Sequence, residues 1–245
     1  MTQAIILCAG AGTRLGELTK YIPKPMIEFN GKPFLQYIIE HYRDYKIKDI
    51  VIPVGYKSEK IKSCLGDGDE MGVKIKYAES SVEAETGGSF KRAIKYIHDE
   101  YFFVQFGDVF FPLDYPKLIK KLKKENKKAL VVVSMRERII EDYEDKNDFI
   151  IGKKGLILGY DRGNKSGKAN VLNGGIFLFR KDIINYRYPD KFRLEEFLFK
   201  YLVSEKEATS FKTKEIPYDI GNIKKIERFK EYIHELSKNG NVGKV

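Results

Sequence analysis

Two short segments near the N-terminus carry residue types that bind phosphate groups. The first joins an apolar run to a glycine-containing turn and an arginine, and reads Leu7-Cys8-Ala9-Gly10-Ala11-Gly12-Thr13-Arg14-Leu15. Glycines let backbone N–H groups approach an anion without an intervening Cβ, and Arg14 follows where its guanidinium can cover phosphate oxygens. The segment is not the dinucleotide-binding pattern G-x-G-x-x-G, because Leu15 replaces the third glycine, and no Gly-Lys-Ser/Thr follows to make a Walker A loop.

The second segment, Pro23-Lys24-Pro25-Met26, holds one lysine between two prolines. Each proline fixes its own φ, and Pro25 favours an extended backbone at Lys24, so a stiff loop presents this ammonium. A loop lysine in a lysine-rich chain is ordinarily a surface residue. Its combination with the upstream glycine loop favours a phosphate ligand instead.

One aspartate follows a predicted strand of the sheet, and a second lies far away in the sequence. Asp108 follows the apolar run 102–106 and Gly107, and Asp219 precedes Ile220 and Gly221. Ligands of open α/β sheets bind at the carboxyl ends of the strands. Either aspartate alone is more often a cap or turn residue.

These segments together resemble the sugar-1-phosphate nucleotidyltransferases. The similarity begins with 7–15, 23–26 and Gly31-Lys32-Pro33-Phe34, and continues at Glu85-Thr86-Gly87-Gly88, Gly107-Asp108, Asn173-Gly174-Gly175 and Asp219-Ile220-Gly221. It implies transfer of a nucleoside monophosphate from a nucleoside triphosphate to a sugar 1-phosphate, with release of pyrophosphate. An acceptor phosphate oxygen is already an adequate nucleophile, so catalysis would come from alignment and charge neutralisation at the α-phosphorus.

The resemblance also implies roles for particular residues. Arg14, Lys24 and Asp108 would be catalytic, with Arg14 on the β and γ phosphates and Lys24 aligning the sugar phosphate. Lys24, Asn173 and Gly174 would bind the sugar phosphate, and Asp108 and Asp219 would hold Mg²⁺, which takes few protein oxygens and keeps water and phosphate ligands. The implied nucleotide-binding residues are Leu7, Ala9, Gly10, Ala11, Gly12, Thr13, Arg14, Glu79, Thr86, Gly87, Gly107 and Asp108.

The base and the sugar are less sharply indicated. Chain size and the segment 31–37 are most similar to heptose- or mannose-1-phosphate guanylyltransferases, which implies GTP and a role in surface polysaccharide synthesis. The Glu-Thr-Gly-Gly form also occurs in uridylyltransferases, so uridylyl and cytidylyl transfer stay open. Relatives read the sugar with a Glu-Lys pair that the stretch 160–165 lacks, which leaves Lys165 and Lys168 as candidates.

Short apolar runs alternate with amphipathic stretches in the first half, the pattern of parallel strands with crossover helices. We expect strands at 4–7, 50–53, 73–77, 102–106 and 130–134, and helices at 34–45, 58–64, 88–98 and 115–125. Together with the resemblance, this pattern predicts an α/β fold: a Rossmann-like three-layer sandwich with a mixed, mainly parallel central sheet.

The second half, where the rhythm loosens, is expected to add a small sugar-binding elaboration. A charged stretch 137–148 precedes a predicted hairpin of 149–151 and 156–160, an apolar run 176–179, helices at 194–202 and 224–236, and a frayed end 239–245. No clean boundary appears. We expect a single domain, 1–245, with a nucleotide-binding half 1–135 and a sugar-binding half 136–245 that ends in the last helix.

Composition excludes several other classes. The 245 residues are 42% hydrophobic and 33% charged, and no apolar run approaches the roughly 18 to 20 residues of a membrane helix, so we expect a cytoplasmic protein without membrane contact. Two cysteines and three scattered histidines make a Cys/His metal site improbable. The net charge of +10 comes from lysines spread as solvated helix faces, such as 117–128, so no nucleic-acid partner is expected.

The sequence also bears on three further interpretations. A nicotinamide-dependent redox enzyme would need the third glycine that Leu15 replaces. A regulatory module that has lost activity would not need both phosphate cations and both carboxylates. A homodimer surface could be built from Phe110, Phe111, Tyr186 and Tyr188, although core and sugar-pocket roles suit these aromatics equally.

Overall fold

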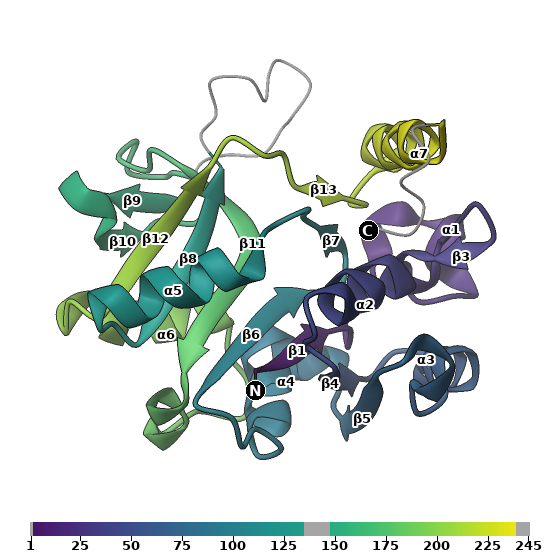
Figure 1. The fold of residues 1–245 in the computed structure, drawn as a ribbon, viewed down its shortest axis with the longest axis horizontal. Helices are drawn as coiled ribbons and strands as arrows, with labels where there is room; N and C mark the ends of the chain where they lie inside the picture. Colours follow the sequence, from purple (N-terminus) through teal and green to yellow (C-terminus); the bar gives the residue numbers. More distant parts are fainter. Residues whose placement is uncertain (1, 135–147, 239–245) are drawn as a thin grey trace.

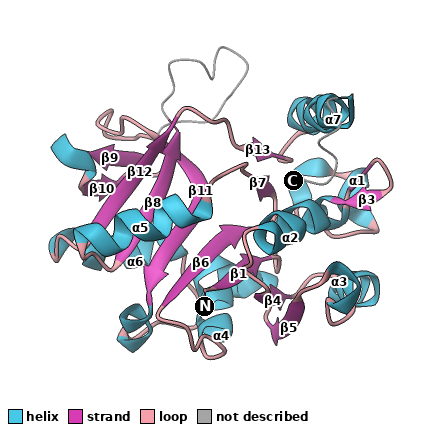
Figure 2. Cartoon of the chain, in the orientation of Figure 1, coloured by secondary structure: helices cyan, strands magenta, loops and turns pink. Residues whose placement is uncertain are grey.

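A computed structural model describes residues 2–134 and 148–238, and a seven-stranded sheet runs through both ranges (Figures 1 and 2). The strand order is β12-β8-β11-β6-β1-β4-β5. These strands are β1 (Gln3–Leu7), β4 (Asp49–Val54), β5 (Lys74–Glu79), β6 (Tyr101–Phe106), β8 (Ala129–Ser134), β11 (Leu172–Arg180) and β12 (Ala208–Thr213).

Four strand pairs of this sheet are parallel and two are antiparallel. β1 lies parallel to β4 and to β6, β4 to β5, and β8 to β12, whereas β11 runs antiparallel to both β6 and β8. The prediction of a mixed, mainly parallel sheet is confirmed. β11 comes from the second half of the chain, so the second half is built into the first sheet.

Helices cover both faces of the sheet, which confirms the three-layer prediction. In Figure 1, α2 and α5 lie in front of the sheet and α4 and α6 behind it. The helices are α1 (Glu17–Lys20), α2 (Phe34–Asp44), α3 (Ser58–Leu65), α4 (Glu85–Ile94), α5 (Tyr115–Glu125), α6 (Leu194–Ser204) and α7 (Ile223–Lys238). Short 3₁₀ turns occur at Thr13–Leu15, Lys24–Met26, Asp69–Met71, Val82–Ala84, Lys153–Gly155 and Lys181–Asn185.

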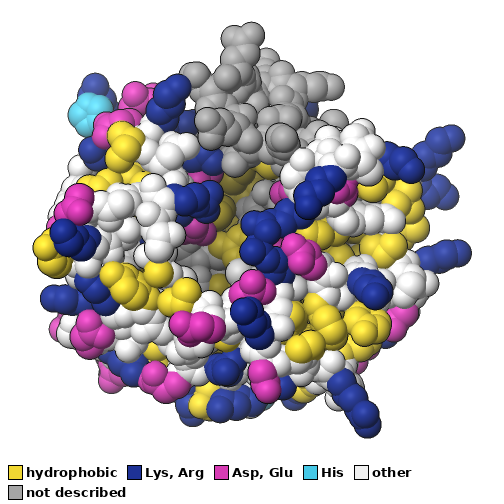
Figure 3. All heavy atoms as spheres, turned by 180° about the vertical axis from the view of Figure 1, so that it is seen from behind, with side chains coloured by type: hydrophobic (Ala, Val, Ile, Leu, Met, Phe, Trp, Pro, Cys, Tyr) yellow, Lys and Arg dark blue, Asp and Glu magenta, His cyan; other side chains and the backbone are white. Residues whose placement is uncertain are grey.

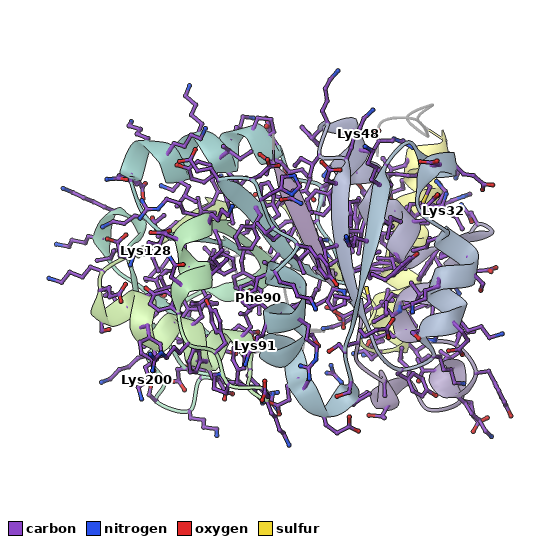
Figure 4. The ribbon with its side chains drawn as sticks, turned by 90° about the horizontal axis from the view of Figure 1, so that it is seen from below. Lys32, Lys48, Phe90, Lys91, Lys128 and Lys200 are labelled. Carbon is purple, nitrogen blue, oxygen red and sulfur yellow. The ribbon has the colours of Figure 1, made fainter. Side chains whose placement is uncertain are left out.

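The two-residue period of the strands divides their side chains between two apolar cores. On β1, Ala4 and Ile6 pack with α2, α5 and α7, whereas Ile5 packs with α4 and α6. Figure 4 shows α4 contributing Phe90 and the neighbouring Lys91. Phe90 is fully buried against the rings on the sheet, and Lys91 forms a surface ion pair, so this helix is amphipathic in the way its spacing requires.

The helix α4 begins earlier and ends earlier than the expected 88–98. Gly87 and Gly88 lie inside the helix rather than at its entry, and a neighbouring loop packs directly on them. The helix stops at Ile94 because the side chain of Gln3 accepts hydrogen bonds from the amides of His98 and Asp99. Side-chain capture of these backbone groups favours a turn over another helical turn.

Most other expectations for the elements are confirmed, but one strand of the central sheet and two short ladders were not expected. The hairpin is present as β9 (Phe149–Ile151) and β10 (Ile157–Tyr160), and the last two helices are α6 and α7. Not expected were β12 and the two-residue ladders β2 (Glu28–Phe29) with β3 (Lys32–Pro33) and β7 (Val109–Phe110) with β13 (Tyr218–Asp219). The end 239–245 and nearly all of the charged stretch 137–148 lie outside the described residues.

The aromatic residues weighed for a dimer surface are mostly core residues. Phe110, Phe111 and Tyr188 are buried within the chain, so the surface interpretation is wrong for these three. Tyr186 is partly buried, and its hydroxyl donates to Glu205. The burial of the aromatic side chains is explained by packing inside one chain.

The surface carries charges of both signs. Figure 3 shows a face that is hollowed near its centre, with basic and acidic side chains interspersed around the hollow. Among the described residues, no helix is long and apolar enough to cross a membrane.

Candidate active site

Two adjoining cavities lie where β1 and β6 end. The first, of about 480 Å³, is lined by the loop after β1 and by Ser81, Val82, Glu85, Thr86 and Ser89. The second, of about 450 Å³, is lined by residues 172–175 and by Pro217, Asp219 and Lys225. Residues lining both are Arg14, Phe106, Asp108, Tyr160, Arg162 and Glu195. This is the edge of the sheet at which the sequence predicted ligand binding.

The loop after β1 folds back on the segment that carries Lys24. Gly12 has φ +65°, and a Cβ at this position would lie 2.8 Å from the Cβ of Lys24. The carbonyl of Gly12 accepts a hydrogen bond from the Thr19 hydroxyl at 3.1 Å. Both the positive φ and the close contact require glycine here, and together they hold the loop against Lys24.

Lys24 and Asp108 form a short ion pair at the junction of the cavities. Lys24 Nζ lies 2.6 Å from Asp108 Oδ2, and the lysine side chain is only 7% exposed. Burial on its own would raise the pKa of the Asp108 carboxyl, but the charge and hydrogen bond of Lys24, with the charge of Arg14, hold it below its ordinary value. Asp108 is therefore a carboxylate at neutral pH.

The fold brings Asp219 to Asp108 through the small ladder of β7 and β13. Asp219 is paired with Val109 in that ladder, and the amide of Ile220 donates to the carbonyl oxygen of Asp108 at 3.1 Å. Asp219 Oδ2 lies 2.7 Å from Nζ of Lys225, whose side chain is 10% exposed. Two carboxylates and two buried lysines therefore meet beside the junction.

These carboxylates fit a magnesium ion better than a metal enclosed by protein. Within residues 2–134 and 148–238, no three His, Cys, Asp or Glu side chains gather into a metal cage. Mg²⁺ is commonly bound by one or two carboxylates plus substrate phosphates and water. Asp108 and Asp219, next to cations that suit phosphate, match that donor set.

Most residues predicted from the sequence line these cavities. Leu7, Ala9, Gly10, Gly12, Thr13, Arg14, Lys24, Thr86 and Asp108 line the first cavity. Asn173, Gly174 and Asp219 line the second. The side-chain oxygen of Asn173 accepts from the amide of Gly175 at 2.9 Å, which fixes its orientation.

Four predicted nucleotide-binding residues line neither cavity: Ala11, Glu79, Gly87 and Gly107. Glu79 is exposed and pairs with Lys62. A Cβ on Gly87 would lie 2.2 Å from the Phe192 ring, and one on Gly107 would lie 2.4 Å from Cys8 Sγ. The structure therefore gives these two glycines packing roles, and only Thr86 of the Thr-Gly pair reaches the cavity.

Arg162, and not Lys165 or Lys168, is the basic residue of this loop that reaches the cavities. It lines both cavities, whereas neither lysine lines either. Its loop is folded by Asp161, whose carboxylate accepts hydrogen bonds from the amides of Lys165 and Ser166. The only signal in the sequence was a basic residue within 160–165.

Glu195 is a second residue that the sequence did not single out. It is buried in the first turn of α6 and lines both cavities. Burial, reinforced by the nearby charge of Asp148, raises its pKa to about 7, while Arg162 opposes the shift. The Thr86 hydroxyl accepts from the amide of Leu194 at 3.0 Å, which links the starts of α4 and α6 behind the cavity.

Glu85 has the most unusual backbone in the site. Its φ of 58° and ψ of −170° fall in a region that is essentially restricted to glycine, which costs about 1–3 kcal/mol. Its side chain is 33% exposed, lines the first cavity, and has Oε1 at 3.7 Å from Arg193 Nε. A negative charge at a helix start contributes only about 0.3–1 kcal/mol, so helix stabilisation alone does not offset the strain.

The chain is similar to known proteins along most of its length. Residues 3–143 match the family described as nucleotidyl transferase. A D-glycero-alpha-D-manno-heptose 1-phosphate guanylyltransferase from Campylobacter jejuni is 38% identical over 197 residues, covering 80% of this chain and 84% of that protein. One of the same name from Aneurinibacillus thermoaerophilus is 29% identical, covering 83% and 86%.

Solved structures agree with the sequence comparison. The crystal structure of HddC from Yersinia pseudotuberculosis superposes with a TM-score of 0.78 at 27% identity, covering 95% of this chain and all of that one. The same protein complexed with GMP-PN gives a TM-score of 0.77 at 26% identity, with the same coverage.

Proposed function

We propose that this chain, which belongs to the nucleotidyl transferase family, transfers a guanylyl group from GTP to a heptose 1-phosphate, with release of pyrophosphate. The observation that carries the proposal is the short pair of Lys24 and Asp108, with Arg14 beside it, at the junction of the two cavities. One cavity suits a nucleotide and the other a sugar. Phosphate-binding and metal-binding groups stand between them.

In this reaction a phosphate oxygen of the sugar attacks the α-phosphorus of GTP. A new P–O bond forms to the α-phosphorus, the bond between it and the bridging oxygen of the β-phosphate breaks, and pyrophosphate leaves with that oxygen. The attacking oxygen is already ionised, so no side chain has to remove a proton. Cys8 lines the first cavity, but burial, together with the charge of Asp108, raises the pKa of its thiol, which excludes a thiolate nucleophile at neutral pH.

The protein's contribution is position and charge. The amides of the loop after β1 and the Arg14 guanidinium would bind the triphosphate, and Lys24 would hold the sugar phosphate in line with the α-phosphorus. Lys24 is held by prolines and is nearly buried, so its ammonium loses little freedom when it binds.

Asp108 and Asp219 would hold Mg²⁺. When bound, the ion neutralises negative charge on the reacting phosphates. The two carboxylates belong to the nucleotide half, 1–135, and to the sugar half, 136–245, which supports one site built by both parts of a single domain.

The choice of GTP and heptose 1-phosphate rests on relatives and on the second cavity. Two relatives are named as heptose 1-phosphate guanylyltransferases, and one of the two HddC structures is a complex with GMP-PN. The second cavity offers Asn173, Arg162 and Glu195, which can bind hydroxyl groups. We assign the product to surface polysaccharide synthesis and the reaction to the cytoplasm, where nucleoside triphosphates are made.

Pyrophosphate release tests this proposal. GTP, UTP, CTP, dTTP and ATP would each be combined, with Mg²⁺, with heptose, mannose, glucose and amino-sugar 1-phosphates. Release confined to GTP with heptose 1-phosphate is the expected result. Release with UTP or CTP would replace the assigned base, release with another sugar would replace the acceptor, and GTP binding without release from any pair would favour an inactive nucleotide-binding module.

A further inference from the structure

The first cavity has a phosphate end and an opposite end formed by Ser81, Val82, Glu85, Thr86 and Ser89. Arg14 and Lys24 mark the phosphate end, next to the second cavity. Lining residues that belong to the first cavity alone include Ser81, Val82 and Glu85. A nucleotide with its triphosphate at Arg14 therefore places its base against this opposite end, because the other direction leads into the sugar cavity.

Glu85 is the acidic side chain at that end, and its backbone adopts a conformation that disfavours any residue other than glycine. Its φ and ψ suit glycine, yet the chain has a residue with a carboxylate at this position. The Arg193 guanidinium lies beside the carboxylate at 3.7 Å, a contact longer than a hydrogen bond. The carboxylate oxygens are therefore oriented by a charge and still have room for a ligand's donors.

We propose that Glu85 selects guanine, its two carboxylate oxygens accepting hydrogen bonds from N1–H and from the 2-amino group of the base. This inference rests on the proposed use of GTP. A carboxylate only accepts hydrogen bonds, and guanine alone among the common bases presents two adjacent donors on that edge. Uracil and thymine place one donor between two carbonyl oxygens, and cytosine and adenine place an acceptor beside their donor, so a carboxylate would repel each of them.

A purely structural role for Glu85 makes different predictions. The residue would then serve the start of α4 and its pair with Arg193, and replacing it would change stability without changing which base is used. Glycine should relieve the backbone, so Glu85→Gly is expected to raise the melting temperature while it removes base selection. A gain in stability combined with a loss of selectivity is not expected of a structural residue.

The experiment compares GTP with ITP, whose base keeps N1–H and lacks the 2-amino group. For the unmodified protein, kcat/KM with the preferred sugar 1-phosphate should be about tenfold higher for GTP than for ITP. In Glu85→Gln, kcat/KM for GTP should fall about 10- to 100-fold, and the GTP/ITP ratio should approach one. The control is Glu83→Gln in the preceding turn, where the side chain is exposed and both values should stay unchanged.

The outcomes distinguish a failure of the proposed function from a failure of the proposed role of Glu85. If the unmodified protein uses UTP or CTP instead of GTP, the proposed function fails. If it uses GTP, and Glu85→Gln keeps both its kcat/KM and its GTP/ITP ratio, the function stands and Glu85 does not read the base. A fall in GTP and ITP use by the same factor would also overturn the inference, because it would show no contact with the 2-amino group.

Discussion

At the residue scale, the site is organised as two neighbouring ion pairs. Lys24 pairs with Asp108, and Lys225 with Asp219. A buried ion pair gains little stability over apolar packing of the same volume, because desolvation offsets the attraction. The presence of two such pairs beside one cavity junction is better explained by ligand binding, in which the lysines would bind phosphate and the carboxylates would bind a cation.

Replacing Lys24 should separate catalysis from nucleotide binding. Lys24→Ala is expected to lower kcat about 10²- to 10³-fold, because the sugar phosphate loses its alignment and the transition state loses a positive charge. The Kd for GTP, measured by calorimetry, should change by less than about threefold, because the loop after β1 and Arg14 remain. An equal loss of GTP binding would show that Lys24 belongs to the nucleotide.

Glu195 should make stability depend on pH. Its pKa in the folded chain is raised to about 7 from an ordinary 4.5, so between these values the folded state holds a proton that the unfolded state releases. The contribution is fully present below about pH 4.5 and is lost as the pH rises through 7, by up to about 3 kcal/mol. Glu195→Gln should flatten denaturation midpoints measured from pH 5 to 8. Glu196→Gln, on the same turn but exposed, serves as control and should keep the dependence.

Residues whose role follows from local chemistry were predictable, and those placed by tertiary structure were not. Gly12 and Lys24 could be recognised because their conformations depend on their own neighbours in sequence. Arg162 and Lys225 could not, since each reaches the site through the packing of a distant element. Glu85 stood in a motif that the sequence analysis used, but its strained backbone and its contact with Arg193 were not predictable. Nothing in the sequence distinguishes Arg162 and Lys225 from the many other charged residues of the chain.

At the scale of elements, the junction of α4 with the loop before α6 sets the shape of the nucleotide cavity. Gly88 lies so close to this loop that a Cβ would stand 2.2 Å from the carbonyl oxygen of Asp190. The amide of Gly87 donates to Phe192 at 2.8 Å, and Thr86 accepts from Leu194. The start of α4 therefore cannot move independently of α6.

Alanine substitutions at Gly88 and Gly10 should separate loss of stability from loss of GTP binding. Gly88→Ala should lower the free energy of unfolding by about 1–3 kcal/mol, because the backbone of Asp190 has to shift. Gly10→Ala meets nothing within 4 Å and should leave stability within about 0.5 kcal/mol, while it weakens GTP binding by placing a methyl group at the phosphate loop. Urea denaturation and GTP titration of both variants test this, and equal stabilities would argue against the packing role of Gly88.

The elements that the sequence could predict are those with a clear apolar period. Both faces of β1 and β8 are buried, and their apolar runs are continuous. β12 was missed because buried Thr209 and Ser210 make it read as polar, although Ser210 donates to the carbonyl of Gly155 at 2.8 Å and so satisfies its hydroxyl. The burial of a polar residue whose hydrogen-bond partner lies on another element cannot be predicted from a single sequence.

At the scale of the whole molecule, the alternation of strands and helices was enough to predict the fold class, but not the strand order. β11 lies between β6 and β8 and runs antiparallel to both, so these two strands do not pair with each other. This insertion carries Asn173 and Gly174 to the second cavity, and the ladder of β7 and β13 carries Asp219 to Asp108. The candidate site is therefore complete only once both halves have folded together.

Because the site joins both halves, its ligands should stabilise the entire domain. At a GTP concentration of 100 times its Kd, with Mg²⁺, binding should add about 2.7 kcal/mol, which is a rise of about 5 to 11 °C in melting temperature for a chain of this size. Chelation of Mg²⁺ by EDTA should remove a large part of that rise, because the negative charge of the phosphates, Asp108 and Asp219 would lack the neutralisation that the ion supplies.

The same melting-temperature measurement on Asp108→Asn and Asp219→Asn tests whether these two carboxylates bind the metal. Each variant should lose the difference between Mg²⁺ and EDTA, since an amide is a weaker ligand than a carboxylate and adds no negative charge. Glu79→Gln, at the exposed end of β5, should keep the full difference. If both aspartate variants retained the Mg²⁺-dependent rise, the ion would be bound by the triphosphate alone, and the two carboxylates would serve only to position Lys24 and Lys225.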